Sequence, residues 1–380
     1  MNFDFSDDQK MLRDQVRKFL TDKCAMTVTR EVLEGDLPHA EEVWDGLVEL
    51  GLVGAAIAEE YGGAGLGALE LCVVAEELGR ACAPVPFATT VYLAADAITR
   101  FGSDAQKQEW LPRIATGMVA TLAVSEGAQS VGAGSVGCRF ENGALNGDKW
   151  PVLDGQSAEL AVVLAKTNEE KNGKEGGLSM VLVDLSGSGS GSGITRESVP
   201  TIDPARKAAR LGFDGAVAEL VGVQGQGWQQ LQALYDRAAV LVAFEQVGGA
   251  EAAMLMTRDY TLERFAFGRQ IGSFQAIKHK LADMYVKLEL ARSNAYYGAM
   301  MLDDDDEDLP IAAAAARVGA TEAYAFAATE SIQIHGGIGY TWEADTQFHY
   351  RRARLLALML GGPLGWKDRL VSRLEEKNAA

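Results

Sequence analysis

The stretch Tyr260–His279, YTLERFAFGRQIGSFQAIKH, carries the clearest local information in the sequence. Its pattern predicts that one helix ends at Leu262–Arg264, that the chain turns sharply at Phe267-Gly268, and that a second helix begins after Ser273. The glycine supplies the backbone freedom that a sharp corner requires. We therefore interpret the rest of the chain around a helix–corner–helix arrangement.

Two polar side chains, Arg264 and Gln275, flank this corner. A guanidinium suits a pyrophosphate because it donates two parallel charge-assisted hydrogen bonds, and the amide beside it adds a further polar group. The alternative is that Arg264 pairs with Glu263 or another surface carboxylate, a contact that contributes little to stability. The stretch alone does not decide between a binding role and a surface ion pair.

A second informative stretch is Gln333–Glu343, QIHGGIGYTWE, which follows an alanine-rich helical pattern over Ile311–Ile334. Gly336 and Gly337 predict the end of that helix. Adjacent glycines also let another molecule approach the backbone closely, although most such pairs only end helices.

Taken together, the two stretches resemble the paired flavin-binding motifs of the acyl-CoA dehydrogenase family. AEEYGGAG with EELGR (Ala58–Gly65 and Glu76–Arg80) and LNGDKW (Leu145–Trp150) agree with that family, in its order and along essentially the whole chain. The resemblance implies an α+β fold of acyl-CoA dehydrogenase type. Its expected domains are an N-terminal α-helical domain over 1–118, a middle β-domain over 119–225, and a C-terminal four-helix bundle domain over 226–380.

The periodicity of the chain predicts the same order of helices, strands and helices. Ser6 with Gln9 indicates a helix start of the capping-box type. Further helices are expected over Glu41–Leu52 and Leu69–Leu78, with a loop at the glycines between them. Strands are expected at Thr121–Ser125, Ala144–Leu145, Glu159–Leu164, Ser179–Asp184 and Ala216–Leu220, with a flexible Ser/Gly loop at Ser186–Gly193. In the C-terminal part, Ile277, Leu281, Met284, Leu288 and Ala291 are expected to form one buried stripe.

Composition excludes several classes of function. The formal net charge of −18 over 380 residues argues against a nucleic-acid-binding protein, which needs a basic face. The same charge means that any site for an anionic CoA ester must be locally basic. The histidines show no metal-binding spacing, and the acidic run Asp303–Asp308 lacks the alternation of a calcium loop, so no metal site is expected.

The sequence also predicts the cellular compartment. Cys24, Cys72, Cys82 and Cys138 lack CxxC spacing and indicate buried thiols in a reducing compartment. The acidic N-terminus resembles neither a signal nor a transit peptide, and no apolar run is long enough to predict a bilayer span. We expect a cytoplasmic protein with no membrane partner.

The resemblance implies FAD as the cofactor and assigns residues to it. The corner residues would contact the FAD from a neighbouring subunit, and the residues around the glycine pair would lie by its adenosine and pyrophosphate part. This split implies at least a dimer, with the flavin at a subunit interface. The predicted contacts are Val124, Ser125, Arg264, Phe267, Gln275, Gln333, Ile334, Gly336 and Gly337. For Ser125 two interpretations stay open: its hydroxyl bonds the isoalloxazine edge, or it only ends a strand.

Two positions depart from the family pattern. The usual hydroxyl after the Asn-Gly turn is replaced by Leu153, so that only backbone groups can serve the flavin there. The usual catalytic glutamate falls on Leu360 in a gapless count from Gly337, and leucine cannot accept a proton.

The catalytic base therefore remains open among three possibilities. Some members of the family carry the base on the helix before the Arg264 motif, where this chain offers Asp236, two residues from the expected position at Ala238. Glu245 lies nine residues further along and projects to roughly the opposite face of that helix. The third possibility is that this chain supplies no base.

Three hypotheses of function follow. The first is an FAD-dependent acyl-CoA dehydrogenase that passes electrons to an electron-transfer flavoprotein, as a homodimer or homotetramer. The second is a non-catalytic, FAD-organising subunit of a heterotetramer with a related chain. The third is a flavin oxidase or monooxygenase on the same fold. The C-terminal YRRARLLALMLGG also resembles bacterial members that act on bulky acyl groups such as steroid side chains.

Overall fold

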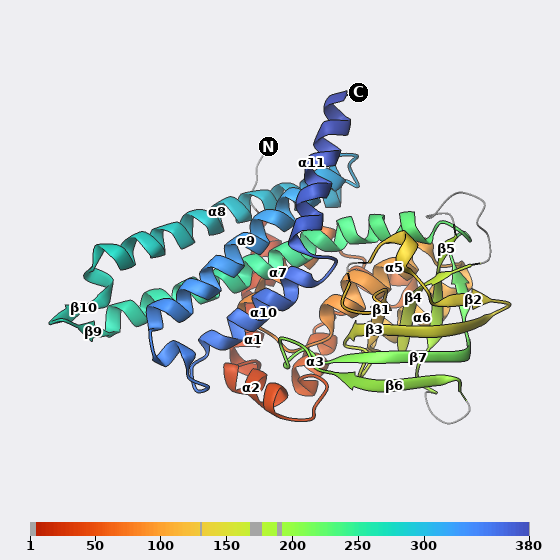
Figure 1. The fold of residues 1–380 in the computed structure, drawn as a ribbon, viewed down its shortest axis with the longest axis horizontal. Coiled ribbons are helices and arrows are strands. Elements are labelled where there is room, and N and C mark those ends of the chain that lie inside the picture. The colour runs from red at the N-terminus through yellow and green to blue at the C-terminus, as the bar shows by residue number, and fades with distance from the viewer. Residues whose placement is uncertain (1–4, 130, 168–176, 188–191, 380) are drawn as a thin grey trace. The chain divides into compact units, whose positions relative to one another are not determined.

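The structure is a computed structural model that describes residues 5–129, 131–167, 177–187 and 192–379 (Figure 1). Its contacts divide the chain into two compact units. Unit 1 comprises Met1–Glu31, Ala68–Ala83 and Ala239–Ala380, and unit 2 comprises Val32–Gly67 and Pro84–Ala238. The boundaries at 118/119 and 225/226 stay a prediction, because this division groups early helices with the C-terminal ones.

Unit 2 contains the sheet. Among the described residues, the sheet has eight strands. Seven of them follow the order β6-β7-β3-β2-β4-β5-β8, and the eighth, β1, pairs in parallel with β4. The strands are β1 (Ala120–Ala123), β2 (Arg139–Glu141), β3 (Ala144–Leu153), β4 (Leu160–Lys166), β5 (Leu178–Asp184), β6 (Ile194–Val199), β7 (Ala208–Val217) and β8 (Glu219–Val221). The helical elements of this unit are α3 (Glu41–Glu49), η1 (Glu59–Tyr61), the π-helix η2 (Ala88–Ala95), α5 (Asp96–Phe101), α6 (Asp104–Ala115) and η3 (Ala133–Ser135), together with the end of α2 (Met26–Glu34) and the start of α7 (Gly227–Glu263).

The expected strands over 121–125, 159–164 and 179–184 are confirmed to within two residues as β1, β4 and β5. The expected strand Ala216–Leu220 covers the end of β7 and the start of β8. It is interrupted at Ala218, whose N–H donates to the Gly143 carbonyl at 3.0 Å. Strand β3 is much longer than predicted. It tolerates Pro151 because its pairing with β7 shifts register between Lys149 and Val152, where a missing N–H disrupts no ladder bond.

The described residues of unit 1 are helical apart from a small pair of strands, β9 (Phe265–Ala266) and β10 (Arg269–Gln270). Its helices are α1 (Asp7–Lys23), α4 (Ala68–Arg80), α8 (Gln275–Asp303), α9 (Leu309–His335), η5 (Ile338–Tyr340), α10 (Thr346–Leu358) and α11 (Pro363–Ala379). Helix α2 (Met26–Glu34) begins in this unit, and α7 (Gly227–Glu263) passes into it at Ala239. The capping box at Ser6 and Gln9 is confirmed, with bonds of 2.9 and 3.2 Å.

Helices α7, α8 and α9 run side by side through unit 1 (Figure 1). The predicted stripe on α8 is confirmed for Met284, Leu288 and Ala291, which are buried, whereas Ile277 and Leu281 are half-buried near the start of the helix. One 18-residue window of α7 has a hydropathy of 1.4, enough by length and composition for a membrane span. Because 72% of that window is buried inside the protein, α7 has the character of a core helix.

Helices α4 and α7 touch backbone to backbone. A Cβ placed on Gly79 would lie 1.8 Å from the Glu245 carbonyl oxygen, and one on Gly248 would lie 1.8 Å from the Glu76 carbonyl oxygen. Real Cβ atoms are essentially never found so close to a backbone oxygen. The two glycines are therefore required by this crossing, which gives EELGR and the glycine pair in α7 a structural role.

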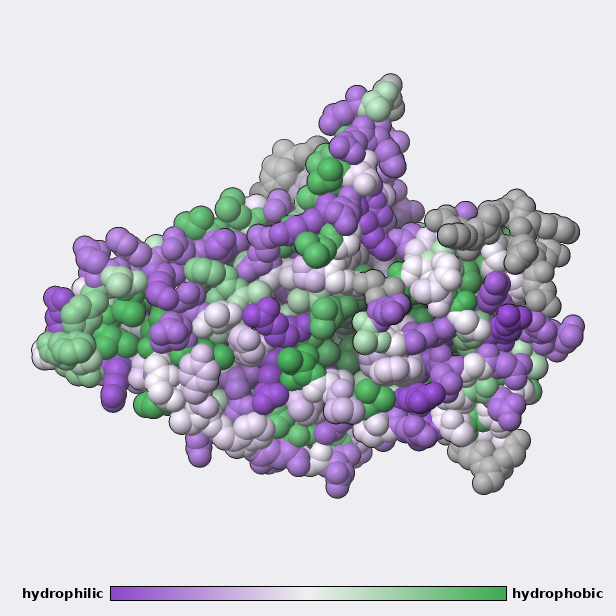
Figure 2. Space-filling view, in the orientation of Figure 1, coloured by the Kyte–Doolittle hydropathy of each residue, from purple (hydrophilic) through white to green (hydrophobic). Residues whose placement is uncertain are grey.

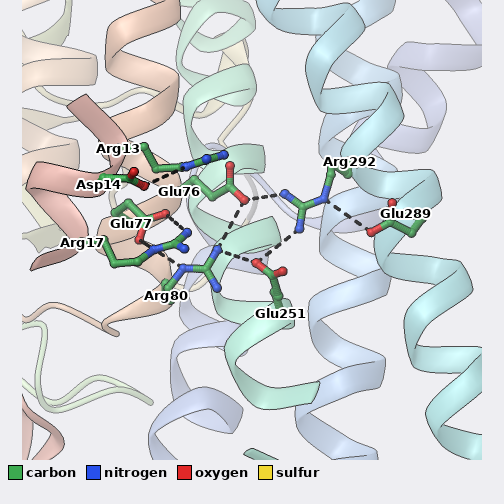
Figure 3. Close-up of polar contacts among 9 residues, drawn as sticks. All are labelled: Arg13, Asp14, Arg17, Glu76, Glu77, Arg80, Glu251, Glu289 and Arg292. Atoms are coloured by element: carbon green, nitrogen blue, oxygen red, sulfur yellow. Dashed lines mark hydrogen bonds and ion pairs between the residues drawn. The ribbon is translucent and has the colours of Figure 1, made fainter. Parts of the chain in front are cut away.

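An ion-pair network surrounds the crossing and joins α1, α4, α7 and α8 (Figure 3). Glu76 and Glu77 on α4 are almost fully buried, with 4% and 1% of their side chains exposed. Arg80 contacts both of them and Glu251, and Arg292 contacts Glu76 and lies 3.3 Å from Glu251. Buried carboxylates are stable only when they are paired in this way.

The four cysteines are buried free thiols, as predicted. Burial raises the pKa of Cys24 to about 12 and that of Cys138 to about 11, so neither is a thiolate near neutral pH.

We predict that Gly79→Ala lowers the thermal unfolding midpoint by about 5 °C or more, because the new methyl group collides with the Glu245 carbonyl. Gly365→Ala is the matched control: its Cβ meets nothing within 4 Å in a helix, where alanine is the better residue. Differential scanning calorimetry compares the variants. A Gly79→Ala protein as stable as Gly365→Ala would contradict the close crossing.

We also predict that Glu251→Gln destabilises the protein at pH 7 by about 1–3 kcal/mol and that this difference disappears in acid. Burial raises the Glu251 pKa, but Arg80 and Arg292 outweigh it, so the net pKa lies below its ordinary value. The stabilisation is thus fully present above the unfolded pKa of about 4.3 and is lost as the pH falls through the lower folded pKa. Urea unfolding from pH 7 to 3 measures it, and a pH-independent difference would contradict the assignment.

Candidate functional site

The corner after α7 is a two-residue hairpin between β9 (Phe265–Ala266) and β10 (Arg269–Gln270). Phe267 and Gly268 both have positive φ, at 52° and 79°, as in the type I′ turns that favour tight hairpins. The Gln270 side chain donates to the Leu262 carbonyl at 2.5 Å and so caps the end of α7. The predicted corner is therefore confirmed, as a fixed hairpin followed by the short η4 turn (Ile271–Ser273) and α8.

The side chains predicted to contact the cofactor project from this corner. Arg264, Phe267 and Gln275 are exposed, and Phe267 is 96% exposed despite being aromatic. Within the described part of the chain, the Arg264 guanidinium and the Gln275 amide make no hydrogen bond or ion pair, so the alternative pairing with Glu263 is not observed. Figure 2 shows hydrophobic side chains gathered where Figure 1 places β9 and β10.

The predicted glycine turn ends α9. Gly336 caps the helix with φ 64°, and Cβ atoms built on Gly336 and Gly337 meet nothing within 4 Å. Gly339 differs, because its Cβ would lie 2.5 Å from the Ile332 carbonyl oxygen, so packing alone requires that glycine. The first two glycines therefore leave open backbone, with Gln333 exposed beside them.

The ends of α7 and α9, which lead into the corner and the glycine turn, contact each other within unit 1 through residues that are 75 positions apart in the chain. The rings of Tyr260 and His335 stack with centroids 4.2 Å apart, and the Tyr260 hydroxyl donates to the His335 carbonyl at 3.3 Å. Tyr260 lies one helical turn before Arg264, and His335 directly precedes Gly336. Burial lowers the His335 pKa, which favours a neutral ring in this stack.

These neighbouring groups match the needs of a dinucleotide cofactor. A pyrophosphate requires a cation and hydrogen-bond donors, and the approach of its oxygens requires backbone without side chains. The end of unit 1 offers an exposed guanidinium, an exposed amide and two bare glycines. The predicted Ile334 is only 7% exposed, so its side chain supports the turn from within the protein.

The remaining predicted contacts, Val124 and Ser125, lie in unit 2 just after β1. Val124 is buried, whereas Ser125 is half-buried and its hydroxyl forms no hydrogen bond with the residues that the structure describes. The Trp150 N–H donates to the Ser125 carbonyl at 2.8 Å. The backbone of Trp150 thus supports this segment.

The position that the gapless count assigns to the usual base holds a buried leucine. Leu360 is 6% exposed and has φ 65°, an uncommon conformation for a large side chain. The turn around it is held by the buried guanidinium of Arg317, which donates to the carbonyls of Leu356 and Met359 and to Gln246 Oε1 at 2.6 Å. A cation at these carbonyls stabilises the end of α10.

The two candidate bases on α7 differ in their surroundings. Glu245 is buried, and its Oε1 lies 3.9 Å from the fully buried Arg352, which also donates to backbone carbonyls of the α4 end. Asp236 is 5% exposed and precedes Arg237, whose Nε donates to Asp96 at 3.0 Å. Glu245 therefore has the environment of a structural carboxylate in unit 1, and Asp236 belongs to unit 2.

Several residues that shape these regions were not found from the sequence. Tyr260 was detectable as the residue one turn before Arg264 on the same helix face. Lys149 falls on the buried face of β3 in the alternation with Leu145, which marks it as an inward-facing cation. Arg317 was detectable as the sole arginine or lysine in the alanine-rich α9.

Comparison with known proteins matches two family models: "Acyl-CoA dehydrogenase, N-terminal domain" over residues 6–118 and "Acyl-CoA dehydrogenase, C-terminal domain" over residues 225–363. The acyl-CoA dehydrogenase IpdE2 of Mycobacterium tuberculosis is 32% identical over 374 residues, covering 97% of this chain and 98% of its own.

Solved structures agree with this match. A chain from work on the electron transferring flavoprotein of Acidaminococcus fermentans superposes with a TM-score of 0.90 at 27% identity, covering 98% of this chain and 99% of that one. A variant of the Tcur3481-Tcur3483 steroid ACAD gives 0.86 at 30% identity, with 98% and 99% covered. The ChsE4-ChsE5 complex from Mycobacterium tuberculosis gives 0.87 at 26% identity, with 99% of each chain covered.

The predicted α+β fold is thereby confirmed, with N-terminal helices, a middle sheet and C-terminal helices in the family's order. The chain belongs to the acyl-CoA dehydrogenase family of flavin-dependent oxidoreductases.

Proposed function

We propose that this protein is an FAD-dependent acyl-CoA dehydrogenase that removes an α-proton and a β-hydride from an acyl-CoA thioester. The observation that carries the proposal is the meeting of the Arg264 corner and the Gly336-Gly337 turn through Tyr260 and His335. The two contacting helix ends lead to a cation that is unpaired among the described residues, to an amide and to open backbone, which are the groups that a dinucleotide requires. When bound, the flavin accepts the hydride; the chain must hold the cofactor and take the α-proton.

The surface of unit 1 supports assembly into at least a dimer. Phe267, Tyr285, Val286 and Leu290 on the corner and on α8 expose between 54% and 96% of their area. Exposed apolar side chains at this density are typical of surfaces that another protein covers. We propose a homodimer or homotetramer in which this surface meets a second copy and completes the flavin site. A cytoplasmic electron-transfer flavoprotein would accept the electrons, in line with the family resemblance.

We assign the proton transfer to Asp236. Leu360 occupies the usual position and has no acid–base chemistry, while Glu245 lies beside the buried Arg352. Asp236 is the other buried carboxylate on α7 and lies near the position where some family members carry their base. A carboxylate beside the substrate removes the α-proton, a role that contributes about 10²–10⁴-fold to the rate.

Leu360 also favours a second function, that of a non-catalytic subunit. A chain with Leu360 in place of the base is suited to be the FAD-organising partner of a related catalytic subunit, in a heterotetramer. The similar ChsE4-ChsE5 and Tcur3481-Tcur3483 proteins carry two gene-product names each, and the latter is described as a steroid ACAD. In this version the substrate would be a bulky acyl-CoA, such as a steroid side chain, and this chain would supply cofactor contacts only.

We predict that Arg264→Met weakens FAD binding roughly tenfold or more, because one or two charge-assisted hydrogen bonds to the pyrophosphate are lost. Arg258→Met is the matched control, since Arg258 lies on the same helix but pairs with the neighbouring Asp259 at 2.7 Å. Fluorescence titration of the apoproteins with FAD measures both. Equal affinities in the two variants, or a wild-type protein that binds no FAD, would reject the assigned site.

We predict that the purified wild-type protein is bleached by at least one member of a panel of straight-chain, branched and steroid acyl-CoA esters, and that Asp236→Asn abolishes bleaching while FAD stays bound. Glu245→Gln is the control that keeps bleaching. Stopped-flow absorbance of the flavin measures the rate. Wild-type flavin that never bleaches favours the non-catalytic subunit, whereas bleaching that survives Asp236→Asn rejects this base.

A further inference from the structure

The segment that follows β1 is held by a part-buried ion pair between Lys149 and Glu126, neither of which is among the predicted flavin contacts. Lys149 on β3 is 0% exposed, and its Nζ lies 2.6 Å from Glu126 Oε1 and 3.1 Å from the Val124 carbonyl oxygen. The Glu126 carboxylate also accepts from the N–H groups of Gly137 and Cys138, at 2.6 and 3.0 Å. One ammonium and one carboxylate thus tie together three separate stretches of unit 2.

Backbone bonds hold the same segment from its other side. The Trp150 N–H donates to the Ser125 carbonyl at 2.8 Å, and the Gly127 N–H donates to the Trp150 carbonyl at 2.8 Å. The backbone from Val124 to Gly127 is therefore fixed on one side by β3. On the other side it is fixed through the Glu126 carboxylate, which binds the N–H groups of Gly137 and Cys138. The Ser125 hydroxyl stays without a hydrogen bond among the described residues, so this rigid segment presents a polar group that the fold does not use.

A gain in stability does not by itself explain the ion pair between Lys149 and Glu126. Burial lowers the Lys149 pKa, and the hydrogen bond from Lys149 to Glu126 only partly offsets this effect. An ion pair with one fully buried charge gains little net stability, because that charge loses its hydration. What the pair adds is a defined geometry, since the ammonium has to meet two oxygens that are separated along the segment.

We propose that Lys149 is a positioning residue, which together with Glu126 fixes the backbone of residues 124–127 so that Ser125 meets the edge of the flavin ring. The proposal rests on the proposed function, because it requires a flavin at Val124 and Ser125. It also makes a claim about the protein without cofactor, namely that the segment is rigid before any ligand binds.

The test compares full-length wild type with Lys149→Met, which removes the charge and keeps the length of the side chain. Arg196→Met is the control: Arg196 is a half-buried cation of the same unit that, like Lys149, donates to backbone carbonyls, those of Gln156 and Ala158 at 2.6 and 2.9 Å. Glu126→Gln is a second variant, which keeps the shape of the carboxylate in case Lys149→Met folds poorly. Each protein is examined by hydrogen exchange without FAD and by fluorescence titration with FAD.

We expect amide exchange over residues 124–127 and 137–138 to accelerate roughly tenfold in Lys149→Met and in Glu126→Gln, and to stay unchanged there in Arg196→Met. The Kd for FAD should rise roughly tenfold in the first two variants, with a shifted flavin absorbance band, and by less than about twofold in the control.

Unchanged exchange over 124–127 in both Lys149→Met and Glu126→Gln would overturn the proposal, as would an equal loss of FAD affinity in Arg196→Met. Accelerated exchange with unchanged FAD affinity and spectrum would also overturn it, because the segment would then be held for stability only. A wild-type protein that binds no FAD rejects the proposed function, and with it the flavin contact of Ser125; the exchange data then still show whether Lys149 holds the segment.

Discussion

The backbone contact between α4 and α7 is the constraint on which unit 1 depends. Because Gly79 and Gly248 carry no side chain, the two helices approach until each glycine touches a carbonyl of the other helix. This approach brings Glu76 on α4 within reach of Arg292 on α8 and brings Arg80 to Glu251 on α7. The direction of α7, and hence the position of the corner at its end, follows from this contact.

The candidate cofactor site uses the ends of these helices rather than their packed sides. Helix α7 ends in a hairpin with two positive-φ residues, and α9 ends in two glycines with open space around them. The Tyr260–His335 stack joins both ends within one chain. A protein with a net charge of −18 can attract an anionic cofactor only through such a local arrangement, in which Arg264 has no carboxylate partner among the described residues.

Much of this organisation was predictable, because helices and motifs leave local marks in the sequence. The capping box at Ser6, the corner at Gly268 and the end of α9 at Gly336 each follow from the backbone demands of one or two residues. The lengths of strands β3 and β7 were underestimated. Pro151 argues against a long strand in the sequence, but in the structure it lies at a register shift between β3 and β7, which depends on the pairing and cannot be read from β3 alone. The role of Lys149 was not predictable either, since the oxygens that accept its hydrogen bonds belong to a segment more than 20 residues away in the sequence.

The central claim is that the corner and the glycine turn jointly hold a dinucleotide flavin, and hydrogen exchange with and without FAD tests it most directly. The account predicts slower amide exchange in peptides that cover both residues 264–275 and residues 333–340, with the same dependence on FAD concentration. Peptides from α11, which contains none of the proposed contacts, should show no comparable change. Protection of only one of the two stretches, or of neither while FAD is bound, would contradict the account.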